Sequence, residues 1–142
     1  MFRHVSGLLS AVVASSLMLI GSGSATIAQQ SAGGAAQENV IRTVELNNWY
    51  RAMLVEREAT RNPRDLEALA RPICEGLAVC RVGIWTEEYA MPNGMPVRAP
   101  QLEAQEYAFG RNQKGEETSL WNCNKYPEFE AEGACLPRVK PN

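Results

Sequence analysis

The stretch from Ala78 to Trp85 reads Ala-Val-Cys-Arg-Val-Gly-Ile-Trp and carries the clearest strand pattern in the chain. Its side chains alternate with a period of two, which places Cys80, Val82 and Ile84 together on one face of an extended strand. Gly83 interrupts the run and predicts either a weaker strand or a β-bulge at that position. Of the whole chain, this stretch has the best-supported strand.

The residues before this strand predict two helices. From Glu38 to Thr60 the chain contains no glycine or proline, and apolar side chains recur at helical spacing, which predicts one long first helix. A second, short helix is predicted to start near residue 62. Asn62 can cap the helix, Pro63 has the backbone φ angle of a first helical turn, and Asp65 places a negative charge at the positive end of the helix dipole. Pro72 then ends or kinks that helix. The apolar side chains of the first helix are Leu46, Trp49, Tyr50, Met53 and Leu54.

The residues after the strand predict a third helix and a second strand. A loop rich in proline and glycine covers residues 91–96, and Pro100 suits the first turn of a helix that continues through Tyr107 and stops at Gly110. A strand is expected over residues 117–123. The distance between the two strands allows either a crossover connection through the helix or an antiparallel pairing.

These elements predict an α+β fold or a small α/β fold in a single domain over residues 38–142. About three helices are expected to pack on a small sheet of roughly two to three strands. The chain has 142 residues, of which 45% are hydrophobic and 21% are charged, and this composition is typical of a globular domain.

The four cysteines predict two disulfide bonds, because an even number of cysteines in a small exported chain is typical of oxidised pairs. We favour the pairs Cys74 with Cys80 and Cys123 with Cys135, since both loops are short and close at little entropic cost. The alternative joins Cys80 to Cys123 and Cys74 to Cys135. Either arrangement stabilises a domain of this size by about 2 to 4 kcal/mol per bond.

The amino-terminal residues predict a secretion signal peptide over residues 1–28. A short basic head at residues 1–4 precedes an uncharged, largely apolar run at residues 5–20. The small side chains within residues 26–28 have the spacing of a signal peptidase cleavage site, and residues 23–25 offer an alternative site.

A permanent membrane anchor is less well supported by this segment. Serine and glycine residues interrupt the apolar run, which is shorter than the roughly 20 residues that a spanning helix needs. The first cysteine is Cys74, so no thiol near the cleavage site can carry a lipid anchor. Residues 29–37 predict a flexible linker. We therefore expect an exported protein, periplasmic or extracellular, with no stable membrane anchor after cleavage.

The composition also disfavours several functions. The formal net charge is −2 and basic residues do not cluster, so we expect no nucleic-acid partner. The single histidine, His4, lies in the expected signal peptide, so the mature chain is expected to contain no histidine. We therefore expect neither histidine-dependent nucleophilic catalysis nor a histidine-ligated zinc site. The chain has no Cys-x-x-Cys motif and no glycine-rich phosphate loop. We expect no cofactor, no metal and no nucleophilic catalytic residue.

Two glutamate carboxylates are sufficient for many glycoside hydrolases, so a small hydrolase acting on a cell-wall or glycan substrate is the alternative function. The candidate residues are Glu87, Glu88, Glu103, Glu106, Glu116 and Glu117. Glutamates on a small domain are more often solvated surface charges, and the sequence shows no environment that would separate the pKa values of two of them.

Aromatic and methionine side chains near the ends of the two expected strands form the candidate binding patch. Its members are Trp85, Tyr89, Met91, Met95, Trp121 and Tyr126. If the strands are neighbours, these side chains can gather into one surface that anchors a partner. The alternative is that Trp85 and Trp121 belong to the core, as most tryptophans are largely buried.

The leading functional interpretation is a small, exported, non-catalytic binding or structural module, such as an inhibitor or a component of an envelope complex. The expected partner is another envelope or extracellular protein, or a glycan. This interpretation follows from the combination of export, disulfides, small size and few side chains suited to catalysis.

Overall fold

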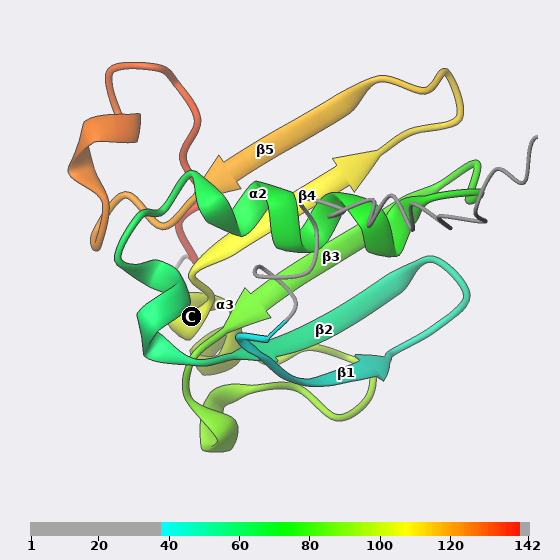
Figure 1. Cartoon of the computed structure of the whole chain (residues 1–142), viewed down its shortest axis with the longest axis horizontal. Coiled ribbons are helices and arrows are strands. Elements are labelled where there is room, and N and C mark those ends of the chain that lie inside the picture. Colours follow the sequence, from blue (N-terminus) through cyan, green and yellow to red (C-terminus); the bar gives the residue numbers. More distant parts are fainter. Residues whose placement is uncertain (1–37, 140–142) are drawn as a thin grey trace, which may run out of the picture.

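The computed structural model describes residues 38–139 and shows an α+β fold built on a five-stranded mixed sheet (Figure 1). The expected signal peptide at residues 1–28 and the expected linker at residues 29–37 lie outside the described residues. Within residues 38–139, no helix is long and apolar enough to cross a membrane.

The strands lie side by side in the same order as in the sequence. They are β1 (Val40–Glu45), β2 (Tyr50–Val55), β3 (Cys80–Trp85), β4 (Tyr107–Arg111) and β5 (Glu117–Trp121). Strands β2 and β3 are parallel, and every other neighbouring pair is antiparallel. The strand expected over residues 78–85 is therefore present as β3, but the sheet is larger than the two to three strands expected.

The prediction of one long helix over residues 38–60 is wrong. This stretch forms β1, a tight turn, β2 and a short 3-10 helix, η1 (Arg57–Thr60). In the turn, the side-chain oxygen of Asn47 accepts hydrogen bonds from the backbone N–H groups of Trp49, at 3.0 Å, and Tyr50, at 2.8 Å. An asparagine that captures amides two and three residues further along the chain favours a reversal over a helix.

The apolar pattern was misleading because β2 is buried on both of its faces. Tyr50, Ala52 and Leu54 pack on one side of the sheet, while Met53 and Val55 pack on the other. A strand that is apolar on both faces loses the alternation that identifies a strand. Its apolar residues then match helical spacing by coincidence.

Helix α2 (Asp65–Ala70) and the 3-10 helix η2 (Arg71–Cys74) connect the parallel strands β2 and β3 and cross the face of the sheet that is turned toward the viewer in Figure 1. The short second helix expected from the sequence is thus present. Its side chains Leu66 and Leu69 are buried in the main core. A connecting helix is the usual way to join two parallel strands.

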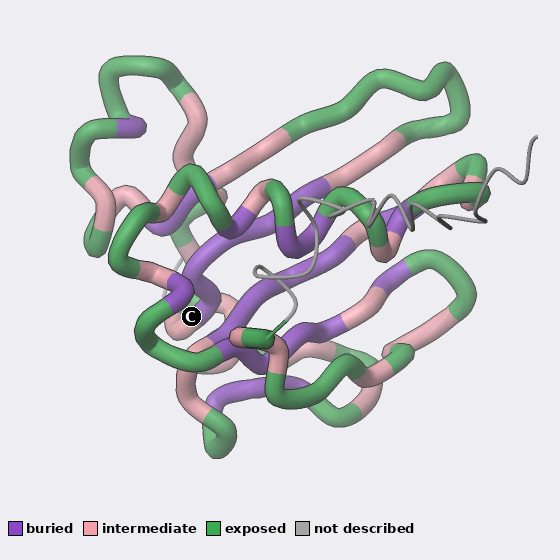
Figure 2. The backbone as a smooth tube through the Cα atoms, in the orientation of Figure 1, coloured by how far each residue is buried: buried purple, intermediate pink, exposed green. Residues whose placement is uncertain are grey.

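The main core lies between α2 and the central strands, which are buried along most of their length in Figure 2. The sheet contributes Met53, Val55, Val82, Ile84, Tyr107, Phe109 and Trp121 to this core. These are the side chains that alternate toward one face of β2 to β5. The face that β3 presents to α2 is the one carrying Cys80, Val82 and Ile84, as the sequence predicted.

The opposite face of the sheet carries a smaller core. It is covered by the 3-10 helix η3 (Glu88–Ala90), the following loop and helix α3 (Ala99–Ala104). Helix α3 lies behind the strands in Figure 1. The indole of Trp85 is fully buried there and donates a hydrogen bond from its ring nitrogen to the backbone oxygen of Gln101, at 2.7 Å.

The prediction that the third helix continues through Tyr107 extends this helix too far at its carboxyl end. Helix α3 ends at Ala104, and Tyr107 begins strand β4, which lies between β3 and β5. The two strands expected from the sequence are therefore not neighbours, and β3, β4 and β5 form an antiparallel meander. The described residues contain two α-helices, α2 and α3, instead of about three.

Both disulfides join cysteines that are close in the sequence. Cys74, the last residue of η2, bonds to Cys80, the first residue of β3, and Cys123 bonds to Cys135 around the 3-10 helix η4 (Pro127–Phe129). These are the pairs favoured by loop length. The second disulfide holds the carboxyl-terminal part of the chain against β5, where Cys135 forms an isolated bridge with Trp121.

Candidate functional site

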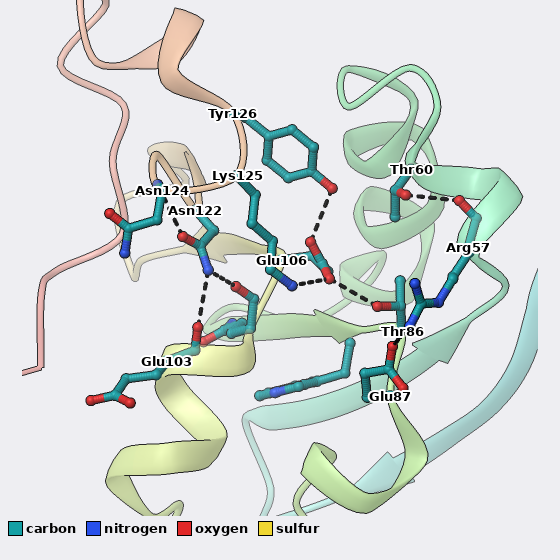
Figure 3. Close-up of polar contacts among 12 residues, drawn as sticks. Arg57, Thr60, Thr86, Glu87, Glu103, Glu106, Asn122, Asn124, Lys125 and Tyr126 are labelled. Carbon is teal, nitrogen blue, oxygen red and sulfur yellow. Dashed lines mark hydrogen bonds and ion pairs between the residues drawn. The ribbon is translucent and has the colours of Figure 1, made fainter.

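Polar side chains gather at one edge of the sheet, where the carboxyl ends of β2, β3 and β5 meet the amino end of β4 (Figure 3). In folds with parallel strands, this edge is where ligands usually bind, because the loops that leave the strands surround it. Residues from each of these loops contribute: Arg57, Thr60, Thr86, Glu87, Glu106, Asn122, Lys125 and Tyr126.

Glu106 is at the centre of this polar edge. Its side chain is 4% exposed, and both carboxylate oxygens accept hydrogen bonds from within the chain. One oxygen, Oε1, accepts from the Thr86 hydroxyl at 2.8 Å and from Lys125 Nζ at 2.5 Å. The other, Oε2, accepts from the Tyr126 hydroxyl at 3.0 Å. The buried negative charge is therefore paired and fully hydrogen-bonded, as stability requires.

Tyr126 stays protonated as a consequence of this environment. Burial raises the pKa of its hydroxyl above the ordinary 10.0, and the nearby charge of Glu106 raises it further. The hydroxyl therefore remains a hydrogen-bond donor to Glu106 and does not act as a base near neutral pH.

Asn122 organises the backbone around Glu106. Its side-chain Nδ2 donates to the backbone oxygens of Glu103, at 3.0 Å, and Gln105, at 2.8 Å. Its backbone N–H donates to the backbone oxygen of Glu106 at 2.9 Å, and its side-chain oxygen accepts from the backbone N–H of Asn124. Asn122 thereby joins the end of β5 to the segment between α3 and β4.

A cavity of about 470 Å³ opens beside this edge, between α3 and the carboxyl-terminal segment. It is lined by Leu102, Glu103, Asn122, Cys123, Asn124, Glu130, Cys135, Leu136, Pro137, Arg138 and Val139. Its volume is within the range of sites that take small ligands. The Cys123–Cys135 disulfide forms part of its wall.

The other candidate glutamates are at the surface and most contact a basic or amide group. Glu87 pairs with Arg57, Glu88 with Arg42 at 3.5 Å, and Glu117 with Arg71 and Arg111 at 2.7 and 2.6 Å. Glu116 accepts from the Asn112 side chain at 2.6 Å, and Glu103 is exposed beside the cavity. Among the six, only Glu106 is buried.

The structure does not bring the six members of the candidate binding patch together. Trp85 and Met91 are buried in the smaller core, while Trp121 is buried in the main core on the opposite face of the sheet. Tyr126 is half-buried against Glu106. Tyr89, which is 87% exposed, and Met95, which is 49% exposed, both follow β3 in the loop that covers the smaller core.

Sequence reasoning missed the roles of Lys125 and Asn122. Lys125 reaches Glu106 from a position 19 residues further along the chain, and nothing local in the sequence predicts that pair. Asn122 offered a weak signal, because an asparagine at the end of a strand often bonds to backbone groups in the turn that follows. Among the described residues, no group of three potential metal ligands is placed to hold an ion.

Comparisons with protein-family models, curated protein sequences and solved structures find no significant match to this chain.

Proposed function

We propose that this protein is an exported, non-catalytic binding module that contacts its partner through the loop after β3. The observation that carries this proposal is the exposure of Tyr89, at 87%, and Met95, at 49%, on a loop that is anchored between them by the buried residues 90–92. Export itself is supported by the amino-terminal sequence pattern and is consistent with the two disulfides.

The loop is braced on both sides of Tyr89. Ala90 and Met91 are buried against the sheet, and the backbone N–H of Ala90 donates to the backbone oxygen of Glu87 at 3.1 Å. Arg57 pairs with Glu87, and Arg42 with Glu88. Tyr89 therefore projects from a turn that is held mainly by the burial of Ala90 and Met91 and by the Ala90–Glu87 backbone hydrogen bond. A rigid exposed anchor loses little conformational entropy on binding, which favours affinity.

The polar edge around Glu106 is better suited to holding the fold together than to catalysis. Three donors of the same chain bind the buried carboxylate, and its side chain is only 4% exposed, which leaves little of Glu106 open to a substrate. A hydrolase would also need a second carboxylate facing the first.

The proposed partner is a protein or glycan of the cell envelope or the extracellular space. Tyrosine is enriched at the centres of protein interfaces, and it also stacks on sugar rings. The acidic side chains of Glu87 and Glu88 flank Tyr89 and are already paired with arginines, so the contact is expected to be mainly apolar and hydrogen-bonded.

Site-specific photo-crosslinking of the full chain in its native host tests this proposal. A photoreactive phenylalanine analogue is placed at the position of Tyr89 and, as a matched control, at the position of Trp49, which is 44% exposed in the turn between β1 and β2. We expect a discrete crosslinked species from the first position only, with a lower yield in the Met95→Ala variant.

Equal yields from both positions, or none from the position of Tyr89, contradict the proposal. A measurable glycan-hydrolysing activity that is abolished by Glu106→Gln, with the fold retained, would replace it with the hydrolase.

A further inference from the structure

The two disulfides of this protein differ in how easily a reagent reaches them. Cys74 is 0% exposed and Cys80 is 2% exposed, because both lie in the main core. Cys123 and Cys135 are half-buried, and both line the cavity of about 470 Å³ between α3 and the carboxyl-terminal segment. Thiol–disulfide exchange requires a thiolate to approach a sulfur atom directly, so access limits its rate.

The Cys123–Cys135 bond closes a loop that we call the 124–134 segment. This segment supplies Lys125 and Tyr126, two of the three side chains that bind the Glu106 carboxylate. It also supplies Phe129, whose ring stacks on Trp121 with centroids 4.0 Å apart and an interplanar angle of 4°. The segment therefore covers both the buried carboxylate and the aromatic end of β5.

We propose that Cys123–Cys135 is a reducible site, which an external dithiol opens while Cys74–Cys80 stays intact, and that this reduction releases the 124–134 segment from the sheet. The cavity is the route by which the dithiol reaches the bond. This inference does not depend on the binding role of Tyr89, because the two features are carried by different loops.

The chemistry is a two-step exchange. A thiolate of the dithiol attacks one sulfur of the pair, the S–S bond breaks, and the other cysteine leaves as a thiolate that takes up a proton. The second thiol of the reagent then attacks the mixed disulfide, and the first cysteine leaves in the same way. The protein gains two thiols and two electrons, and the dithiol becomes a cyclic disulfide.

The contacts that remain after reduction are all non-covalent. Lys125 and Tyr126 bind Glu106, and Phe129 stacks on Trp121. Arg64 and Glu132 form an ion pair at 2.5 Å, but their side chains are 62% and 45% exposed, and such pairs contribute little. Opening the disulfide restores the conformational freedom of the loop, which favours detached states. The sheet itself remains, since β1 to β4 and the Cys74–Cys80 bond are not involved.

The test uses the full chain with both disulfides formed, treated with dithiothreitol under native conditions and then with an alkylating reagent. Peptide mass spectrometry measures labelling of each cysteine. Tryptophan emission, recorded in a Trp49→Phe background, measures exposure of Trp121, which is 4% exposed in the intact protein while Trp85 is 0% exposed. Circular dichroism measures retention of the sheet.

We expect labelling of Cys123 and Cys135 to be at least about tenfold faster than labelling of Cys74 and Cys80, because the core pair reacts only after the fold opens. The emission should shift to longer wavelength while the sheet signal is retained. Equal labelling of all four cysteines, earlier labelling of Cys74, or loss of the sheet together with the first bond overturns the proposal. An unchanged emission after selective reduction also overturns it, because the segment would then have stayed in place.

Two variants give a second measurement. Replacing both residues of the pair, Cys123→Ser with Cys135→Ser, should reproduce the shifted emission without any reductant. Phe129→Ala, with both disulfides intact, provides the emission of an uncovered Trp121 for comparison. If the serine double variant loses the sheet, the segment is required for folding and the proposal fails.

Discussion

The indole ring of Trp85 lies against Gly83 of the same strand, so closely that a Cβ atom on Gly83 would come within 2.6 Å of two ring carbons. The same Cβ would come within 2.5 Å of the Gln105 side-chain nitrogen. Gly83 is therefore neither a bulge nor a weak point of β3. It leaves the space in which Trp85 and Gln105 are buried.

Gly83→Ala should destabilise the protein by about 1 to 3 kcal/mol, because the added methyl group forces apart a packed ring and a packed amide. The matched control is Gly110→Ala on the neighbouring strand, where a new Cβ meets nothing closer than a backbone oxygen at 4.0 Å. Urea unfolding of the two variants measures the difference. Equal midpoints for both alanine variants would contradict this account of Gly83.

Glu106→Gln should lower the free energy of unfolding by about 2 kcal/mol, because Lys125 loses its charged partner and one hydrogen-bond acceptor becomes a donor. The estimate is below the value for a fully buried pair, since the Lys125 side chain is 42% exposed. Glu88→Gln, whose carboxylate is 74% exposed, should change stability by less than about 0.5 kcal/mol. A double-mutant cycle with Lys125→Met that shows no coupling would contradict the pairing.

Stability should fall at alkaline pH because burial raises the pKa of three tyrosines among the described residues, Tyr50, Tyr107 and Tyr126. Burial raises the pKa of Tyr107 and of Tyr126 above the ordinary 10.0 in the folded protein. The unfolded chain therefore releases these protons first, and the contribution of each group is complete below pH 10.0 and is lost as the pH rises toward the folded pKa.

The midpoint of urea unfolding should decrease as the pH rises from 9, which is about one unit below the ordinary tyrosine pKa. Tyr107→Phe or Tyr126→Phe should make this decrease shallower. Tyr89→Phe is the control, because Tyr89 is 87% exposed. A slope that is unchanged in both buried-site variants would show that other groups cause the decline.

The protein purified from its native host should begin at Gln29 and contain no free thiol. Intact-mass and amino-terminal analysis, with and without reduction, measures both properties. Recovery of the chain with Met1 at its head and four alkylatable cysteines would contradict export, since the signal peptide and the oxidised disulfides are expected to occur together.

Local sequence signals predicted the elements whose pattern is set by short-range chemistry. Strand β3 alternates clearly, helix α2 begins shortly after Asn62 and Pro63, and the two disulfides close the shortest loops. The predicted capping by Asn62 is wrong, because the N-cap residue of α2 is Arg64, which makes no side-chain cap hydrogen bond. The long helix expected over residues 38–60 failed at β2 for a physical reason, which is the burial of that strand on both faces. Strand β2 is covered by α2 on one side and by the loop after β3 on the other, so its apolar residues lack the alternation of a half-exposed strand.

The candidate site was less accessible to sequence reasoning. The sequence did not distinguish Glu106 from the other five candidate glutamates. Its burial depends on Lys125 and Tyr126, which belong to a loop distant in the sequence. The aromatic patch required β3 and β5 to be neighbours, whereas β4 lies between them. Such long-range placement depends on the order of strands in the sheet, and no single motif in the chain encodes it.

The isolated bridge between Trp121 and Cys135 also affects how the sheet meets other molecules. The backbone N–H of Trp121 donates to Ala134, and the backbone oxygen of Trp121 accepts from Leu136. The outermost strand would otherwise offer these groups, beside its most apolar residue, to a strand from another copy. The carboxyl-terminal segment of the same chain occupies this border, so these backbone groups of Trp121 are not available to pair with a strand of another molecule.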